Sequence, residues 1–176
     1  MYRTPRSVAK ALVLLAGLLG ALAAPLAQAE ARAEEGAEEI DWMALVPAGW
    51  EPEAPDMSSF FHGGSGPSTG QSADAPVVDA LHDRRVILEG WLVPLEMERA
   101  ERYHEFLLVP YFGACIHVPP PPANQVVHLF LEEGVSQDEV FEPQRVTGRL
   151  RVDASITEMA AAGYRMEDAT ATVAQW

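Results

Sequence analysis

The amino-acid sequence predicts a mainly β protein, a small Greek-key or OB-like barrel with one short helix. Several segments are rich in β-branched and aromatic residues, and some of them are apolar on both faces, which is typical of strands in a closed barrel. From Arg145 to Val152, apolar and polar residues alternate with a period of two. Five strands are expected, at residues 85–96, 105–112, 125–131, 145–152 and 164–173.

The first expected strand, Arg85 to Glu96, contains Gly90 and Pro94. A glycine inside a strand indicates a bend, and a proline indicates an edge or an end, so we expect a strand that bends at Gly90. Met97 to His104 is polar and is expected to connect the first two strands, as a loop or a helix. In the alternating strand, Val146, Gly148, Leu150 and Val152 are expected to face inward, and Arg145, Thr147, Arg149 and Arg151 outward.

The short helix is expected between the last two strands. Ser155 to Glu158 matches a capping box, Met159 to Ala162 would continue the helix, and Gly163 fits its C-terminal cap. An OB-type barrel usually has its helix between the third and fourth strands. This difference leaves another small β-rich fold open as an alternative.

The first 29 residues have the pattern of a cleaved secretory signal peptide. Three basic residues precede an apolar run from Ala11 to Ala24, and Ala27-Gln28-Ala29 follows as the expected cleavage site. The apolar run is shorter than the roughly 20 residues that span a bilayer, which disfavours the alternative of a transmembrane anchor. We therefore expect a periplasmic protein that is exported by a cleaved signal peptide.

Three further regions are expected after residue 29. Residues 30–50 form an acidic tail in which Trp42, Leu45 and Trp50 are too apolar for a free segment. We expect them to clip onto the domain, with a partner-binding segment as the alternative. Residues 51–76 collect Pro, Gly, Ser and Asp, which predicts a flexible linker that proteases cut first. Residues 77–176 then form the barrel domain.

The charge of the chain excludes one class of partner. The formal net charge is −14, and removal of the basic signal peptide makes the protein more acidic still. Nucleic-acid binding depends on neutralising phosphates with Lys and Arg, so a nucleic-acid binder is excluded on electrostatic grounds.

The segment from Tyr111 to Gln125, YFGACIHVPPPPANQ, is the expected functional site. It holds the only cysteine, a histidine two residues later, and the four prolines Pro119, Pro120, Pro121 and Pro122. Successive prolines favour a stiff, extended backbone. In such a backbone Cys115 and His117 leave the same face with Cα atoms about 6.6 Å apart, so one metal ion could reach both.

The thiolate and the imidazole are suitable ligands for zinc and for copper(I). Two ligands are too few, and the candidates to complete the set are His128, His104, Glu96 and Glu105, of which His128 is preferred. The alternatives are that Cys115 is a small buried apolar residue and that each histidine is bound by a backbone carbonyl.

A second hypothesis is a metal-independent adaptor that binds a partner along the proline segment. Its surface would consist of Tyr111, Phe112, Pro119, Pro120, Pro121, Pro122, Asn124 and Gln125. A thiol-dependent enzyme with Cys115 as nucleophile is third, because residues two apart on an extended strand project in parallel and do not meet. The sequence holds no Cys-x-x-Cys, phosphate-binding glycine loop, His-Glu-x-x-His or Gly-x-Ser-x-Gly, which favours a binding protein over an enzyme.

The same box also carries a family resemblance. Together with GWLVPLE (Gly90 to Glu96) and the surrounding EFLLVPYFGACIHVPPPPANQVVH (Glu105 to His128), it resembles a family of bacterial exported proteins of unknown function, over about residues 77–174. Members are often predicted to be periplasmic proteins or lipoproteins, and they are often encoded beside ABC transporter genes, some linked to zinc supply. The resemblance implies a metal-related accessory role with envelope ABC transporter components as partners. The signal region has no cysteine that could accept a lipid.

Overall fold

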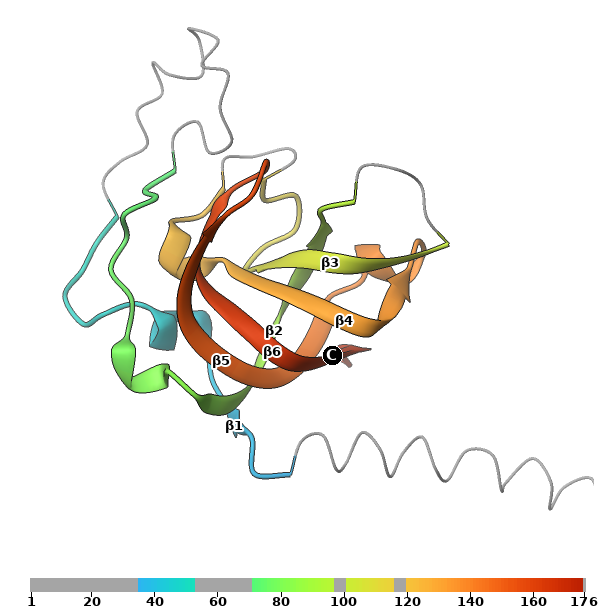
Figure 1. The fold of residues 1–176 in the computed structure, drawn as a ribbon, viewed down its shortest axis with the longest axis horizontal. Helices are drawn as coiled ribbons and strands as arrows, with labels where there is room; N and C mark the ends of the chain where they lie inside the picture. Colours follow the sequence, from blue (N-terminus) through green and yellow to red (C-terminus); the bar gives the residue numbers. More distant parts are fainter. Residues whose placement is uncertain (1–34, 53–70, 97–100, 116–119, 176) are drawn as a thin grey trace, which may run out of the picture. The chain divides into compact units, whose positions relative to one another are not determined.

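The computed structural model describes residues 35–52, 71–96, 101–115 and 120–175. The expected signal peptide lies outside these residues. The strands are β1 (Glu38–Glu39), β2 (Arg84–Pro94), β3 (Arg102–Val109), β4 (Val127–Ser136), β5 (Gln144–Ile156) and β6 (Ala161–Val173). The helical elements are single 3-10 turns: η1 (Trp42–Leu45), η2 (Asp79–Leu81), η3 (Ala123–Gln125) and η4 (Glu139–Phe141) (Figure 1). Within the described ranges, no helix has the length and apolar character needed to cross a bilayer.

Five strands close into a barrel. The sheet order is β1-β2-β3-β4-β6-β5, and β2 also pairs with β5, which closes the circle. β4 and β6 run parallel, and the other barrel neighbours run antiparallel. This arrangement is an OB-type Greek-key barrel, so the predicted fold class is confirmed.

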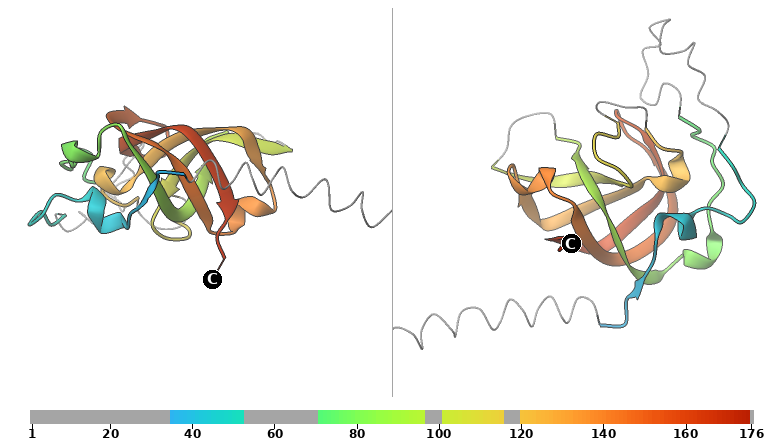
Figure 2. Two further views of the ribbon diagram at one scale, coloured as in Figure 1. Left: turned by 90° about the horizontal axis from the view of Figure 1, so that it is seen from below. Right: turned by 180° about the vertical axis from the view of Figure 1, so that it is seen from behind.

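Gly90 is the point at which β2 changes partner. Residues Arg84 to Gly90 pair with β5, and Trp91 to Pro94 pair with β3, as β2 runs along the back of the barrel (Figure 2, right). A Cβ atom on Gly90 would lie 2.5 Å from the carbonyl oxygen of Val109 and 2.9 Å from Cζ2 of Trp42. The bend predicted at Gly90 is present, and only a residue without a side chain fits there.

Two hydrophobic clusters explain why some strands are apolar on both faces. Phe106 and Leu108 of β3 belong to the main cluster, whereas the intervening Leu107 and Val109 belong to a second one. Successive side chains of a strand point to opposite faces. The second cluster therefore lies outside the barrel, on the outer face of β3, and its other buried members are Val93, Ala114, Val126, Ala160 and Ala162.

The predicted helix from Met159 to Ala162 is wrong. β5 continues to Ile156, and β6 begins at Ala161, so a tight turn joins two antiparallel strands. The hydroxyl of Thr157 closes this turn by accepting from the backbone N–H of Ala160 at 3.1 Å. Gly163 lies inside β6, where a Cβ would come within 3.0 Å of the Ala123 carbonyl oxygen, so its role is close packing and not helix capping.

The one helical turn between barrel strands β4 and β5 is η4, which is the position where OB-type barrels carry their helix. The alternation of β5 holds for Val146 and Leu150, which are fully buried. Thr147, expected to face outward, is instead buried, in register with Ile87 of β2 and Thr170 of β6.

The segments before β2 pack onto the barrel. Leu45 is fully buried in the main cluster, and the indole N–H of Trp42 donates to the carbonyl of Glu89 at 2.7 Å. Tyr164 donates to the carbonyl of Leu45 and accepts from the N–H of Val78. Trp42 and Leu45 thus pack onto the barrel, and Trp50, the third residue of the expected clip, is half-buried.

Ordered packing begins before the expected Val77. The side-chain amide of Gln71 donates to the carbonyls of Pro121 and Ala161 and accepts from the N–H of Ala161, at 2.8–2.9 Å. The neighbouring Ser72 accepts from the N–H of Ala123. Residues 71–76, assigned to the linker by composition, therefore form a strap across the barrel, because one glutamine satisfies three backbone groups at once.

Candidate functional site

The loop between β3 and β4 begins with a sequence of tight turns. The N–H of Ala114 bonds back to the carbonyl of Tyr111 at 3.5 Å, and Gly113 has a φ of 80°. Cys115 also has a positive φ, 65°, which is uncommon for a residue other than glycine. His117 and Pro119 lie outside the described residues, so the geometry of the predicted Cys115–His117 pair stays a prediction.

The second end of the loop is fixed by the strap. Pro121 is buried and its carbonyl is bound by Gln71. Asn124 is completely buried and its side-chain amide donates to the carbonyl of Pro76 at 2.9 Å. Pro120 and Pro122 are half-buried, as is Gln125. Asn124 and Pro121 therefore hold the loop in place and cannot form the exposed recognition surface expected of them.

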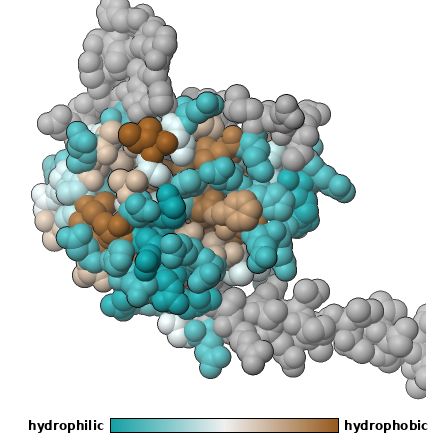
Figure 3. Space-filling model, in the orientation of Figure 1, coloured by the Kyte–Doolittle hydropathy of each residue, from teal (hydrophilic) through white to brown (hydrophobic). Residues whose placement is uncertain are grey.

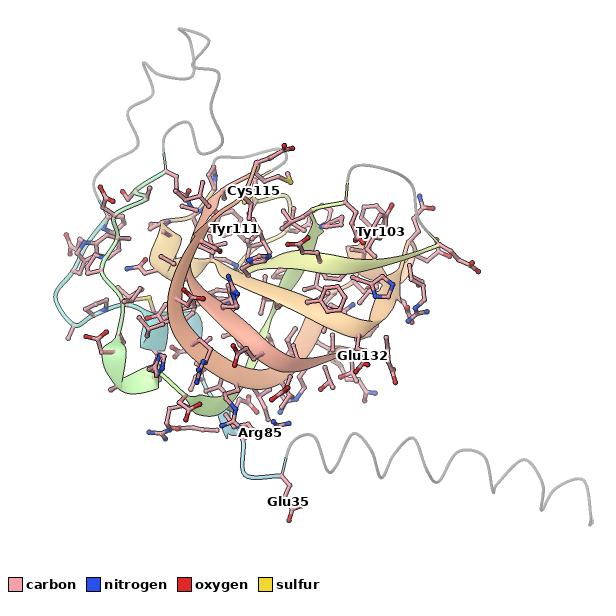
Figure 4. All side chains as sticks on the ribbon, in the orientation of Figure 1. Glu35, Arg85, Tyr103, Tyr111, Cys115 and Glu132 are labelled. Atoms are coloured by element: carbon pink, nitrogen blue, oxygen red, sulfur yellow. The ribbon has the colours of Figure 1, made fainter. Side chains whose placement is uncertain are left out.

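Two adjacent aromatic side chains are exposed at the start of the loop. Tyr111 is 41% exposed and Phe112 is 59% exposed. Tyr111 and Cys115 lie on the same part of the barrel (Figure 4). Partial burial, together with the nearby Cys115, raises the pKa of Tyr111, so its hydroxyl is protonated at neutral pH.

Cys115 packs against the second cluster, as do the partly buried Met159 and Trp91. Burial raises the pKa of its thiol to about 11. The thiolate is the form that attacks substrates and binds metals, and it is scarce at neutral pH in this environment. This environment fits the small apolar residue better than the activated nucleophile.

His104 occupies a separate site on β3. Its Nδ1 lies 2.9 Å from the carbonyl oxygen of Leu131, which can only accept, so Nδ1 carries the proton. The ring stacks on Phe130 with centroids 5.8 Å apart. The backbone N–H of His104 donates to Glu96 at 2.8 Å. A backbone carbonyl thus binds His104, as the alternative to metal ligation foresaw.

His128, on β4, uses both ring nitrogens. Nε2 lies 2.8 Å from a carboxylate oxygen of Glu105, and Nδ1 lies 3.2 Å from the hydroxyl of Ser155. A carboxylate only accepts, so Nε2 is protonated, and in the neutral imidazole Nδ1 accepts from the Ser155 hydroxyl. A carboxylate, an imidazole and a serine in series resemble a catalytic triad with the two nitrogens exchanged.

This series does not open onto a substrate site in the described part of the molecule. The adjacent cavity, of about 340 Å³, is lined by Glu105 and His128 but not by Ser155. The Ser155 contact was not predicted, because the pattern around Ser155 matches a helix cap. No local signal could have found it, since the contact depends on β5 and β4 being brought together through β6.

The expected ligand set does not assemble among the described residues. No group of three or more His, Cys, Asp or Glu side chains in these ranges could hold a metal ion. Cys115 borders the second cluster, His104 is bound to Leu131, and His128 is bound to Glu105. Among the described candidates, Glu105 therefore joins His128 and Glu96 joins His104, but no three of them come together around one ion.

Comparison with known proteins places the chain in a family. Residues 42–173 match the family described as "Protein of unknown function (DUF3299)". The chain belongs to the DUF3299 family. The match begins at Trp42, so the aromatic clip belongs to the DUF3299 region together with the barrel.

A solved structure agrees with this assignment. The crystal structure of a DUF3299 family protein from Pseudomonas aeruginosa PAO1 is 42% identical in sequence and matches with a TM-score of 0.67. The match covers 80% of this chain and 99% of that chain. No curated protein matches the chain.

Proposed function

We propose that this DUF3299 protein is a periplasmic adaptor that binds a protein partner through Tyr111 and Phe112. The observation that carries the proposal is the exposure of these two adjacent aromatic side chains on a loop with anchored ends. Aromatic residues exposed in a free protein gain most when a partner buries them, and they are enriched among the residues that dominate binding energy.

The anchored ends support the proposal on entropic grounds. The turn at Ala114 fixes one end of the loop, and the bonds from Gln71 and Ser72 fix the other. A recognition surface that is already ordered loses less conformational entropy on binding. Envelope ABC transporter components are the partners that the family resemblance implies, and the predicted signal peptide supports a periplasmic location.

The experiment is site-specific photo-crosslinking in the producing cell. A photoreactive amino acid replaces Phe112 or, as the control, Phe141, which is 61% exposed on η4. A discrete adduct from position 112 and none from position 141 is the expected result. Adducts from neither position, or equally from both, would contradict the proposal.

Once the adduct identifies the partner, the affinity of the purified pair measures how much the two aromatic residues contribute to binding. Tyr111→Ala with Phe112→Ala should weaken binding by roughly 10-fold to 100-fold, the range for residues that dominate an interface. Phe141→Ala should leave the affinity unchanged. Equal losses in both variants would mean that the loop is not the recognition surface.

Zinc or copper binding at Cys115 and His117 is the second candidate function. One observation favours it: Cys115 adopts a positive φ, and backbone outliers of this kind cluster at functional sites. The test is the metal content of the purified protein, with about one equivalent expected and none in a Cys115→Ser, His117→Ala double variant. Unchanged metal content in the double variant would reject this candidate.

A further inference from the structure

A cleft opens in the barrel wall where β4 and β6 separate. The two strands pair in parallel from Val127 and Tyr164 to Leu131 and Ala169, and not beyond. The cleft past this point has a volume of about 630 Å³, which is in the range of ligand-binding pockets. Its walls are residues 130–135 of β4 and 168–173 of β6, and Arg102, Glu139 and Gln144 also line it.

Local backbone irregularities cause the separation. On β4, four residues stand opposite the single residue His104 of β3, and Gly134 has a φ of 65°. A Cβ on Gly134 would lie 2.7 Å from the carbonyl oxygen of Tyr103, so the bulge requires glycine. On β6, Asp168 has a φ of 49° at a second irregularity. Bulges redirect strands, and here they turn the two strands apart.

The β6 wall of the cleft is an open strand edge. Past Ala169, β6 pairs only with β5 in the described part of the chain, which leaves its other edge facing the cleft. The β4 wall is different, because it is the bulged segment after Leu131, in which Arg102 already binds the carbonyls of Glu133 and Gly134. Open edges present backbone N–H and C=O groups in the spacing that an extended peptide matches.

The cleft is acidic. Glu132, Glu133, Glu139 and Asp168 line it, against the single basic residue Arg102. The guanidinium of Arg102 donates to the carbonyls of Glu133 and Gly134, at 2.7 and 2.9 Å. Asp168 lies 4.0 Å from the guanidinium of Arg149. Hydrogen bonds from Ser136 lower the pKa of Glu139, so this carboxylate stays ionised at neutral pH.

Several acidic side chains elsewhere on the barrel have close arginine partners. Arg151 contacts Asp83 at 2.7 Å, and Arg145 contacts Glu89 at 2.8 Å. The face that carries β4 and β6 is mainly hydrophilic, with small separate hydrophobic patches (Figure 3). The cleft therefore combines a backbone template for a strand with an excess of negative charge.

We propose that this cleft binds an extended peptide segment rich in Lys or Arg, by addition of a strand to the open edge of β6. The peptide backbone pairs with this edge, and its basic side chains face the carboxylates that line the cleft, among them Glu132 and Glu133. The cleft residue Glu132 lies away from Tyr111 and Cys115 (Figure 4), so this site is separate from the aromatic loop and does not depend on the proposed function.

The experiment uses the full mature chain and defined peptide probes. Acetyl-Lys-Val-Lys-Val-Lys-amide is titrated into ¹⁵N-labelled protein, and amide shifts are followed by NMR. The expected shifts occur at residues 132–135 and 169–173. A peptide with Glu in place of Lys, and a Lys peptide with N-methylated backbone amides, should each bind at least tenfold more weakly.

A variant pair tests the charge contribution. Glu132→Gln with Glu133→Gln should weaken binding of the Lys peptide about tenfold in low salt, because two carboxylates that line the cleft are neutralised. Glu51→Gln with Glu158→Gln, two exposed carboxylates outside the cleft, changes the net charge equally and should leave the affinity unchanged.

Three outcomes would overturn the proposal. The first is equal binding of the N-methylated peptide, which would exclude strand addition. The second is saturation of the same amide shifts by calcium chloride or spermidine alone, which would make the cleft a simple cation site. The third is an equal loss of peptide affinity in both double variants, which would show that only the net charge of the protein matters.

Discussion

Cys115 shows how the surroundings of one residue change its chemistry. Its thiol lies against the apolar second cluster, and burial raises its pKa to about 11. A metal site or a nucleophile needs the thiolate. Any metal binding at Cys115 therefore has to displace a proton that the fold itself retains.

This environment predicts that the Cys115 thiol is alkylated slowly. At pH 8, alkylation of Cys115 by iodoacetamide should be about 100-fold slower in the folded protein than in urea, from the difference in thiolate fraction. The rate in the folded protein should rise tenfold per pH unit up to about 11. Equal rates in the folded and unfolded protein would show that the thiol is neither buried nor suppressed.

The same pKa predicts a pH dependence of stability. The unfolded chain loses the thiol proton near the ordinary value of 9.0, whereas the folded chain keeps it to about 11. The contribution of the protonated thiol is thus complete below pH 9.0 and is lost as the pH rises towards 11. Cys115→Ala should show a smaller loss of unfolding free energy across this window than the parent protein. Identical pH profiles would contradict the prediction.

The histidines show what sequence could not supply at the residue scale. Composition marked His104 and His128 as candidate ligands, but their partners follow from the register of neighbouring strands. Glu105 lies opposite Phe130, and His128 lies opposite Leu107, which places the Glu105 carboxylate diagonally beside the His128 ring. A shift of one position would turn these side chains to the other face.

At the scale of single elements, the bend of β2 depends on Gly90. Gly90→Ala would place a methyl group against the carbonyl of Val109 and the ring of Trp42. We expect the unfolding free energy, measured by urea denaturation, to fall by about 3 kcal/mol, which is near the upper end for overpacking.

Gly49→Ala is the control for this prediction. Gly49 has a φ of 80°, and no atom lies within 4 Å of the position that an added methyl group would take, so its substitution costs only backbone strain. That cost should be about 1 kcal/mol. A loss for Gly90→Ala no larger than that for Gly49→Ala would mean that close packing does not fix the bend.

The strap gives a second prediction at this scale. Gln71→Ala leaves the N–H of Ala161 and the carbonyls of Pro121 and Ala161 without their side-chain partner. The unfolding free energy should fall by about 1–3 kcal/mol, and the amide of Ala161 should exchange faster with solvent.

The control for the strap is Gln125→Ala, since the Gln125 side chain makes no hydrogen bond within the described residues. Its stability should stay within about 0.5 kcal/mol of the parent, as for ordinary surface changes. A Gln71→Ala protein as stable as this control would show that residues 71–76 do not hold the loop.

The strands were predictable from sequence, and the connections were not. Alternation and β-branched residues predicted all five barrel strands, because burial against one or two clusters dictates side-chain type. The prediction of a helix after β5 was wrong. Ser155 to Glu158 matches a local capping pattern, but the pairing of β5 with β6 overrides this local preference. The strap was missed because a glutamine among Pro, Gly and Ser gives no hydrophobic signal. Of the candidate site, the exposed aromatics were found, but the burial of Asn124 and Pro121 depends on that strap.

At the scale of the whole molecule, Tyr164 joins the N-terminal segment to the barrel. Its buried hydroxyl donates to the carbonyl of Leu45 at 2.8 Å and accepts from the N–H of Val78 at 2.7 Å. Burial raises the pKa of Tyr164, so the hydroxyl keeps its proton across the neutral range. One oxygen atom thus connects three distant parts of the chain.

Tyr164→Phe should lower the unfolding free energy by about 1–2 kcal/mol, because two buried backbone groups lose their partner. The melting temperature should fall by several degrees, and the amide of Val78 should exchange faster. Tyr103→Phe is the control, since the Tyr103 hydroxyl makes no hydrogen bond in the described part of the chain. Equal melting temperatures for the two variants would contradict the role assigned to Tyr164.

The double pairing of β2 also bears on the order in which the protein folds. β3 follows β2 closely along the chain, but Gly90 must find Gln144 and Arg84 must find Leu150 before the barrel closes. Bringing distant residues together costs chain entropy before contacts compensate, so the closing step is expected to be late and to limit the folding rate. A chain that ends before Gln144 would leave one edge of β2 without its partner, and such edges recruit other chains into aggregates.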